Sequence, residues 1–214
     1  MNWRTHEFLA RQMAPLLRER WGELFDEKKF VAGCIKPDMT ALFVTHPHFW
    51  NISKKFIYKK IDRLSGKILH SRNKKKFNEQ LGIVTHYVAD FFTSAHNTER
   101  NRILEHIAFE DELHRQFLSN VRDETVRALY QDPSDRHSGK HSAARKWLAR
   151  EHSGYTPNMK NCTADIEPIV RACIIVSAMI LAAAATKTAK ISNIVIHPDF
   201  EYSILVAGGI PQHA

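Results

Sequence analysis

The sequence predicts an all-α protein, a single-domain bundle of several helices. Apolar residues recur at helical spacing along most of the 214 residues, and few runs alternate apolar and polar residues as strands do. No repeat or low-complexity linker divides the chain, whose length suits one domain. Hydrophobic residues make up 43% and charged residues 25%, as in ordinary globular proteins. We therefore expect one domain over residues 1–214, with an irregular tail from about residue 191.

The expected helices follow from apolar spacing and from the residues that interrupt helices. A first helix presents one apolar face made of Phe8, Leu9, Met13, Leu16 and Leu17. Gly33 and the prolines at positions 37 and 47 predict an irregular stretch over 31–50. The tail after the last helix could include a short strand. The remaining helices are expected at about 52–64, 75–95, 100–118, 142–152 and 166–190.

The most apolar run is too short to span a bilayer. It covers the 14 residues 172–185, whereas a membrane-spanning helix needs roughly 20. A buried core helix is the better interpretation. The N-terminus opens directly into an amphipathic pattern and lacks the apolar core of a signal peptide, so a cytoplasmic location is expected. Cys34, Cys162 and Cys173 are odd in number and lack paired spacing, so they predict no disulfide framework.

Positive charge is concentrated in one segment. The formal net charge is +8, yet the segment from Lys54 to Lys76 holds ten basic residues against one acid, Asp62, and so carries +9. Such a patch favours a phosphate-bearing partner, either an anionic membrane surface or, less readily, a nucleic acid. A solvated helix face without a partner is the alternative interpretation.

The segment from His86 to Glu110 has the spacing of a metal site. His86 and Asp90 lie four residues apart, as do His106 and Glu110, so each pair shares one face of a helix. His96 lies between the pairs, where the chain turns. A single pair would normally be a surface ion pair, but two pairs and a histidine within 25 residues indicate metal binding, and mixed imidazole and carboxylate ligands suit zinc. Further ligands must come from earlier residues, for which the candidates are His6, Asp38, His46 and His48.

Six short motifs in this order resemble the zinc-dependent phospholipase C family, which shares its fold with the fungal single-strand nucleases. They are W-R-T-H at 3–6, K-P-D at 36–38, H-F-W at 48–50, H-Y-V-A-D at 86–90, H-N at 96–97 and H-I-A-F-E at 106–110. The last three form the specific part. The chain departs from the family pattern in two places. Trp3 follows Met1 and Asn2, where the secreted enzymes begin with tryptophan, and Ser94 replaces a frequent proline.

The resemblance implies up to three zinc ions. One would be held by His48, His86 and Asp90, with Asp38 nearby as ligand or general base. His46 stays an alternative to His48. A second ion would be held by His96, His106 and Glu110, and a third by His6, the bridging Asp90 and groups at the chain start.

The leading functional hypothesis is a phosphodiesterase that hydrolyses phospholipid head groups or similar phosphodiesters through metal-activated water. A nuclease or 3′-nucleotidase on the same scaffold is one alternative. Aromatic side chains that could stack on bases would favour it, and the candidates are Phe49, Trp50, Tyr87, Phe91 and Phe92. The other alternative is a helical module that binds metal but has lost turnover.

Overall fold

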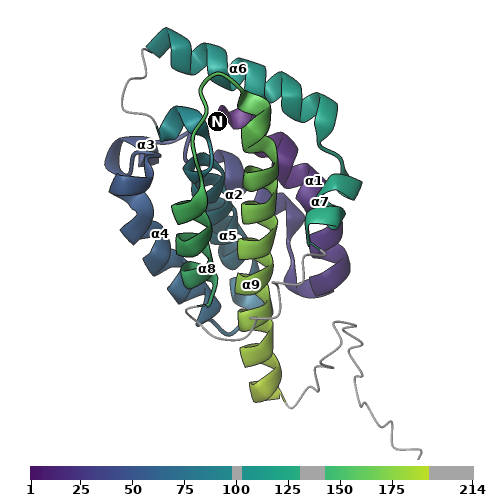
Figure 1. The fold of residues 1–214 in the computed structure, drawn as a ribbon. Helices are drawn as coiled ribbons and strands as arrows, with labels where there is room; N and C mark the ends of the chain where they lie inside the picture. The colour runs from purple at the N-terminus through teal and green to yellow at the C-terminus, as the bar shows by residue number, and fades with distance from the viewer. Residues whose placement is uncertain (98–102, 131–142, 193–214) are drawn as a thin grey trace, which may run out of the picture.

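The computed structural model describes residues 1–97, 103–130 and 143–192, and these form a bundle of α-helices without strands. The predicted all-α fold is confirmed. Figure 1 shows α6 lying across the end of the bundle at which the N-terminus is found. The helices are α1 (Trp3–Trp21), α2 (Glu27–Ile35), α3 (Leu42–Thr45), α4 (Trp50–Ser65), α5 (Ser71–Phe91), α6 (Ile103–Asn120), α7 (Asp123–Tyr130), α8 (Ala143–Gly154) and α9 (Ile166–Ser192).

Helix α9 lies in the core. It is long and apolar enough to cross a membrane by composition alone, but 89% of its most apolar window is buried inside the protein. It packs against α4, α5, α7 and α8, so its apolar residues are covered on most sides. A helix that is apolar all round needs such cover. The prediction of a buried core helix is therefore confirmed.

Helices α2 and α5 cross at very short range because each contributes a glycine to the contact. A Cβ added to Gly33 would lie 2.1 Å from the carbonyl oxygen of Glu79, and one added to Gly82 would lie 2.2 Å from that of Phe30. The expectation of an irregular stretch over 31–50 was therefore partly wrong. Residues 31–35 belong to α2, and Gly33 serves helix packing where we expected a break.

Other boundaries differ from those expected. Helix α5 begins at Ser71, ahead of the expected residue 75, and ends at Phe91. A short 3-10 helix, Ser94–His96, then replaces the last turn of the expected helix. Helix α7 was not predicted. The expected helix start at residues 100–102 and the expected tail strand lie outside the described residues.

Candidate metal centre

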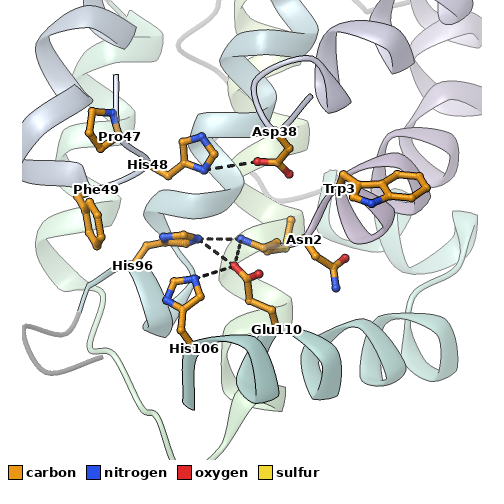
Figure 2. Close-up of a pocket in the computed structure, with 10 residues that line it drawn as sticks. Asn2, Trp3, Asp38, Pro47, His48, Phe49, His96, His106 and Glu110 are labelled. Carbon is orange, nitrogen blue, oxygen red and sulfur yellow. Dashed lines mark hydrogen bonds and ion pairs between the residues drawn. The ribbon is translucent and has the colours of Figure 1, made fainter. Parts of the chain in front are cut away.

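All eight predicted ligands meet at one end of the bundle, beneath α6. Helix α5 provides His86 and Asp90 from its last turns, and the chain reversal that follows provides His96. The other helices and their flanking segments bring the rest of the set, which is His6 from α1, Asp38 after α2, His48 before α4, and His106 and Glu110 from α6. Figure 2 shows Asp38 and His48 facing His96, His106 and Glu110 across a cavity.

Asp90 is the hub of this cluster and is fully buried. Its Oδ1 lies 3.3 Å from Nε2 of His6 and 3.4 Å from Nε2 of His96. Its Oδ2 lies 3.1 Å from Nδ1 of His48 and 3.2 Å from Nε2 of His86. Burial alone would raise the pKa of Asp90, but the Met1 amino group and the histidines outweigh burial and hold this pKa well below its usual range. Asp90 is thus an ionised carboxylate in contact with four imidazoles.

The donor atoms form three groups, two of which share His96, and in each group all ligand atoms lie within 4.8 Å of one another. His96, His106 and Glu110 form one of them, with the composition expected from the resemblance. The composition of the other two groups differs from that expectation. His6 and Asp38 join His86 in one, and His48 and Asp90 join His96 in the other.

The hydrogen bonding of His86 prepares its other ring nitrogen for a cation. Its Nδ1 donates to the main-chain carbonyl of Cys34 at 2.7 Å. Because a carbonyl can only accept, Nδ1 carries a proton, and in the neutral tautomer Nε2 then presents its lone pair towards Asp38 and Asp90. Metal-binding histidines are commonly fixed by such a bond on the second nitrogen. Cys34 therefore acts through its backbone, and its side chain packs in the core.

Several of the converging atoms are buried without a hydrogen-bond partner. Among the described residues these include Nε2 of His6, Nε2 of His86, Oδ2 of Asp38 and Oδ2 of Asp90. Burying such groups unpaired costs free energy, roughly 1–3 kcal/mol for a neutral polar group and more for a charge. Cations bound among these donors would satisfy them, so the residues fit divalent metal ions.

The amino nitrogen of Met1 lies inside the donor set. It forms an ion pair with Asp90 and lies 2.9 Å from Nε2 of His96 and 3.1 Å from Oε1 of Glu110. Burial would lower the pKa of this amine, but the two carboxylates outweigh burial and raise it to about 11. A positive charge therefore occupies the space between Asp90 and Glu110. The indole of Trp3 does not join the donors and lines the cavity instead.

The cavity beside the donors has a volume of about 420 Å³. Its walls include Asp38, His48, Phe49, His106 and Glu110. Of the two histidines that the sequence left as alternatives, His48 faces the site. The ring of His46 lies against Phe56 at 3.8 Å between centroids, and its Nδ1 contacts Thr45.

A group of polar residues that sequence reasoning missed holds the turn carrying His96. Buried Asp165 accepts hydrogen bonds from the Ser94 amide at 2.7 Å and from the Ser94 hydroxyl at 2.8 Å. The Tyr155 hydroxyl donates to the same carboxylate at 2.6 Å. These hydrogen bonds restrict the backbone at Ser94, as the ring of a proline would. No spacing rule connects Asp165 to His96, so the sequence carried no signal for this contact.

Two further histidines lie near the site without joining it. His152 is half-buried, stacks on Trp50 at 3.7 Å between centroids and contacts Asn97 at 3.2 Å. His114 contacts the Thr5 hydroxyl at 3.0 Å through Nδ1. Both therefore support residues that neighbour ligands in the sequence.

Comparison with known proteins agrees with this geometry. The family model described as "Zinc dependent phospholipase C" matches residues 5–162, a span that holds all eight donors. Searches of curated proteins and of solved structures gave no match. The matched span covers well over half of the chain, and the chain therefore belongs to the zinc-dependent phospholipase C family.

Proposed function

We propose that this protein is a zinc-dependent phosphodiesterase that hydrolyses phospholipid head groups or similar phosphodiesters. The observation that carries the proposal is the convergence of five histidines and three carboxylates on one cavity, with buried donor atoms left unpaired. Membership of the family supports the same reaction class. The arrangement suits an anionic substrate because bound cations would neutralise both the carboxylates and the phosphate.

The eight donors would hold up to three zinc ions, with Asp90, which contacts four of the histidines, as the shared ligand that the family resemblance implies. When bound, zinc polarises a phosphoryl oxygen, lowers the pKa of a bound water and stabilises the leaving alkoxide. The protein supplies the fixed positions of these donors. Helix α5 contributes two of them from one face, and Cys34 and Asp165 hold the segments carrying His86 and His96.

Asp38 is the residue best placed to handle the proton of the attacking water. It lines the cavity wall, with Oδ1 3.5 Å from Nε2 of His86 and 3.7 Å from Nδ1 of His48. Burial raises the pKa of Asp38, and the charge of Asp90 raises it further, against the opposing effect of His86. A carboxylate with a raised pKa is a stronger base, so Asp38 can orient the water and accept its proton.

The nuclease alternative has less support. Of the aromatic residues that could have stacked on bases, Tyr87, Phe91 and Phe92 are buried in the core. Trp50 is stacked on His152, so of these five residues Phe49 alone lines the cavity, where Trp3 is the other aromatic residue. The alternative of a metal-binding module that has lost turnover would keep the same donors, so the number of bound zinc ions and the measured turnover decide between the two.

The decisive experiment compares zinc-reconstituted protein on a phosphatidylcholine analogue, a generic soluble phosphodiester and single-stranded DNA. We expect turnover of the first two, and three bound zinc ions by metal analysis. Replacing Asp38 with Asn should lower turnover by roughly 10²–10⁴-fold, the range for a general base.

Matched histidine variants test the ligand assignment. His48→Ala should reduce both zinc content and activity, whereas His46→Ala should preserve them, because the His46 ring lies on Phe56 and away from the donors. Protein that binds no zinc after reconstitution would contradict the proposal. Full activity in Asp38→Asn would disprove the role given to that residue.

A further inference from the structure

Large apolar side chains are exposed close in sequence to the residues that line the cavity. Leu104 is 81% and Ile103 77% exposed, and both lie within three residues of His106 in the first turns of α6. Ile107 follows His106 directly and is also exposed. The opposite side of α6 packs into the core through Phe109, Leu113 and Phe117. The turns of α6 that carry a donor to the cavity therefore also present aliphatic side chains to solvent.

The facing wall of the cavity has the same property. Met39 follows Asp38 in the chain and is 64% exposed, and Val44 and Ile52 are exposed to a similar extent. These residues flank the segment that lines this wall with Asp38, His48 and Phe49. Figure 2 shows the two walls, with Asp38 and His48 opposite His106 and Glu110. We use the term apolar rim for Met39, Val44, Ile52, Ile103, Leu104 and Ile107.

Basic residues continue directly from the apolar rim along α4. Ile52, Lys55, Lys59 and Arg63 are exposed at spacings of three and four, so they share one helix face. At 1.5 Å per residue, Lys55 lies about 5 Å and Lys59 about 10 Å along the axis from Ile52. Within the described chain, neither lysine has a carboxylate partner. This stripe of α4 therefore presents unpaired positive charge beside the mouth.

The structure separates this stripe from the other half of the basic segment. Lys75 and Lys76 lie in the first turns of α5, and His86 lies in its last turns. The rise of an α-helix places Lys76 about 15 Å along the axis from His86, well beyond the screening length of about 8 Å at physiological salt. By the same rise, Lys55 lies about 8 Å along the axis from Trp50 at the start of α4, so Lys55 is the lysine of the stripe that lies closest to the cavity.

We propose that the apolar rim and the basic stripe of α4 dock on an anionic lipid bilayer, with the cavity mouth facing the lipid. This inference rests on the proposed function, for which the bilayer would supply the substrate. Aliphatic side chains gain free energy at the acyl boundary, and neighbouring lysines gain it from anionic head groups. A nucleic acid would leave the aliphatic side chains without an apolar contact. A two-fold dimer through this face would bring its lysines close to those of the second copy.

The test measures co-flotation with phosphatidylcholine vesicles that contain or lack phosphatidylglycerol. The double variant Ile103→Ser/Leu104→Ser should bind about tenfold more weakly, because two aliphatic contacts are lost. Leu118→Ser is the matched control, because Leu118 is an exposed leucine of the same helix, near its other end. It should bind like the native protein. Equal binding by all three proteins would overturn the proposal.

The charge is tested in the same assay. Lys55→Gln/Lys59→Gln should weaken binding to anionic vesicles by about fivefold per lysine, and high salt should abolish the difference. Lys75→Gln/Lys76→Gln, which removes the same charge far from the cavity, should have the smaller effect. A larger effect of the Lys75 and Lys76 change would overturn the placement of the docking face.

Two further measurements separate this proposal from the proposed function. The Ile103→Ser/Leu104→Ser variant should hydrolyse a short soluble phosphodiester at the native rate and lose activity only on vesicles. If the native protein hydrolyses the soluble ester but does not bind vesicles, docking fails and the proposed function stands. If vesicle binding depends on the rim but no ester is hydrolysed, docking stands and the proposed function fails. If the rim variant instead changes a dimer into a monomer and leaves vesicle binding intact, the rim is a self-association surface and the bilayer proposal is wrong.

Discussion

Replacing Gly33 with Ala should damage the metal centre from a distance. The added Cβ would lie 2.1 Å from the Glu79 carbonyl oxygen and 3.0 Å from the Gly82 Cα, and both contacts are with backbone. Ordinary contact begins at 3.4 Å, so α2 and α5 would have to separate by more than 1 Å. The hydrogen bond between the Cys34 carbonyl and His86 is 2.7 Å long and joins the same two helices, so this separation would lengthen or break it.

The expected magnitude combines opposing contributions. Overpacking costs about 1–3 kcal/mol, and loss of the His86 hydrogen bond costs about 1 kcal/mol. The better helix propensity of Ala returns up to about 1 kcal/mol. The net loss of unfolding free energy is therefore about 1–3 kcal/mol. For a chain of this size it corresponds to a fall in Tm of roughly 2–12 °C. Because His86 would lose its orienting partner, zinc affinity should also fall by about 10–100-fold.

Thermal unfolding and competition for zinc against a chromophoric chelator would measure the two effects. Gly154→Ala is the matched control, because no atom lies within 4 Å of a Cβ added there. Its Tm and zinc affinity should stay close to the native values. Native stability and zinc affinity in Gly33→Ala would show that the close crossing of α2 and α5 does not position His86.

Two other predictions concern residues that support the site. Asp165→Asn should reduce zinc affinity by about tenfold with the helix content unchanged, because Ser94 loses a charged acceptor and the turn carrying His96 loosens. The exposed neighbour Glu167→Gln serves as its control in the same zinc titration, and equal affinity in the two variants would contradict the role of Asp165. Burial lowers the pKa of His152 to about 4, whereas the ordinary value in the unfolded chain is about 6.5. As the pH drops from about 6.5 towards 4, the unfolded chain is therefore protonated at His152 before the folded protein is, and the free energy of unfolding should fall. His152→Gln should flatten the pH dependence of Tm in that window, and an unchanged profile would refute the assignment.

The sequence predicted those parts of the site that depend on local spacing. His86 and Asp90, like His106 and Glu110, are four residues apart on a helix, and the structure places each pair on one face as that spacing requires. Asp38 is separated from these pairs by about fifty and about seventy residues, so no periodicity could bring it to them. The family resemblance supplied that connection.

The failures of prediction also have physical causes. Gly33 was interpreted as a helix break because glycine has low helix propensity, but the crossing with α5 requires the absence of a side chain there. Tertiary packing therefore outweighed the local preference. Asp165 lies beyond the residues matched by the family and far from Ser94 in sequence. A contact of this kind is visible only once the chain is folded.

The charge balance of the cluster gives the strongest physical reason to expect cations in it. Burial lowers the pKa of His6 to about 3 and that of His96 to about 4, so both are neutral near pH 7. The charge of the three carboxylates is opposed by the Met1 ammonium and by His48, whose pKa Asp90 raises against the opposing effect of burial. A buried carboxylate without compensating charge costs several kcal/mol. With His48 protonated and all three carboxylates ionised, these five groups together carry an excess negative charge. Divalent cations would remove this excess and satisfy the unpaired donor atoms in the same step, which neutral ligands could not do.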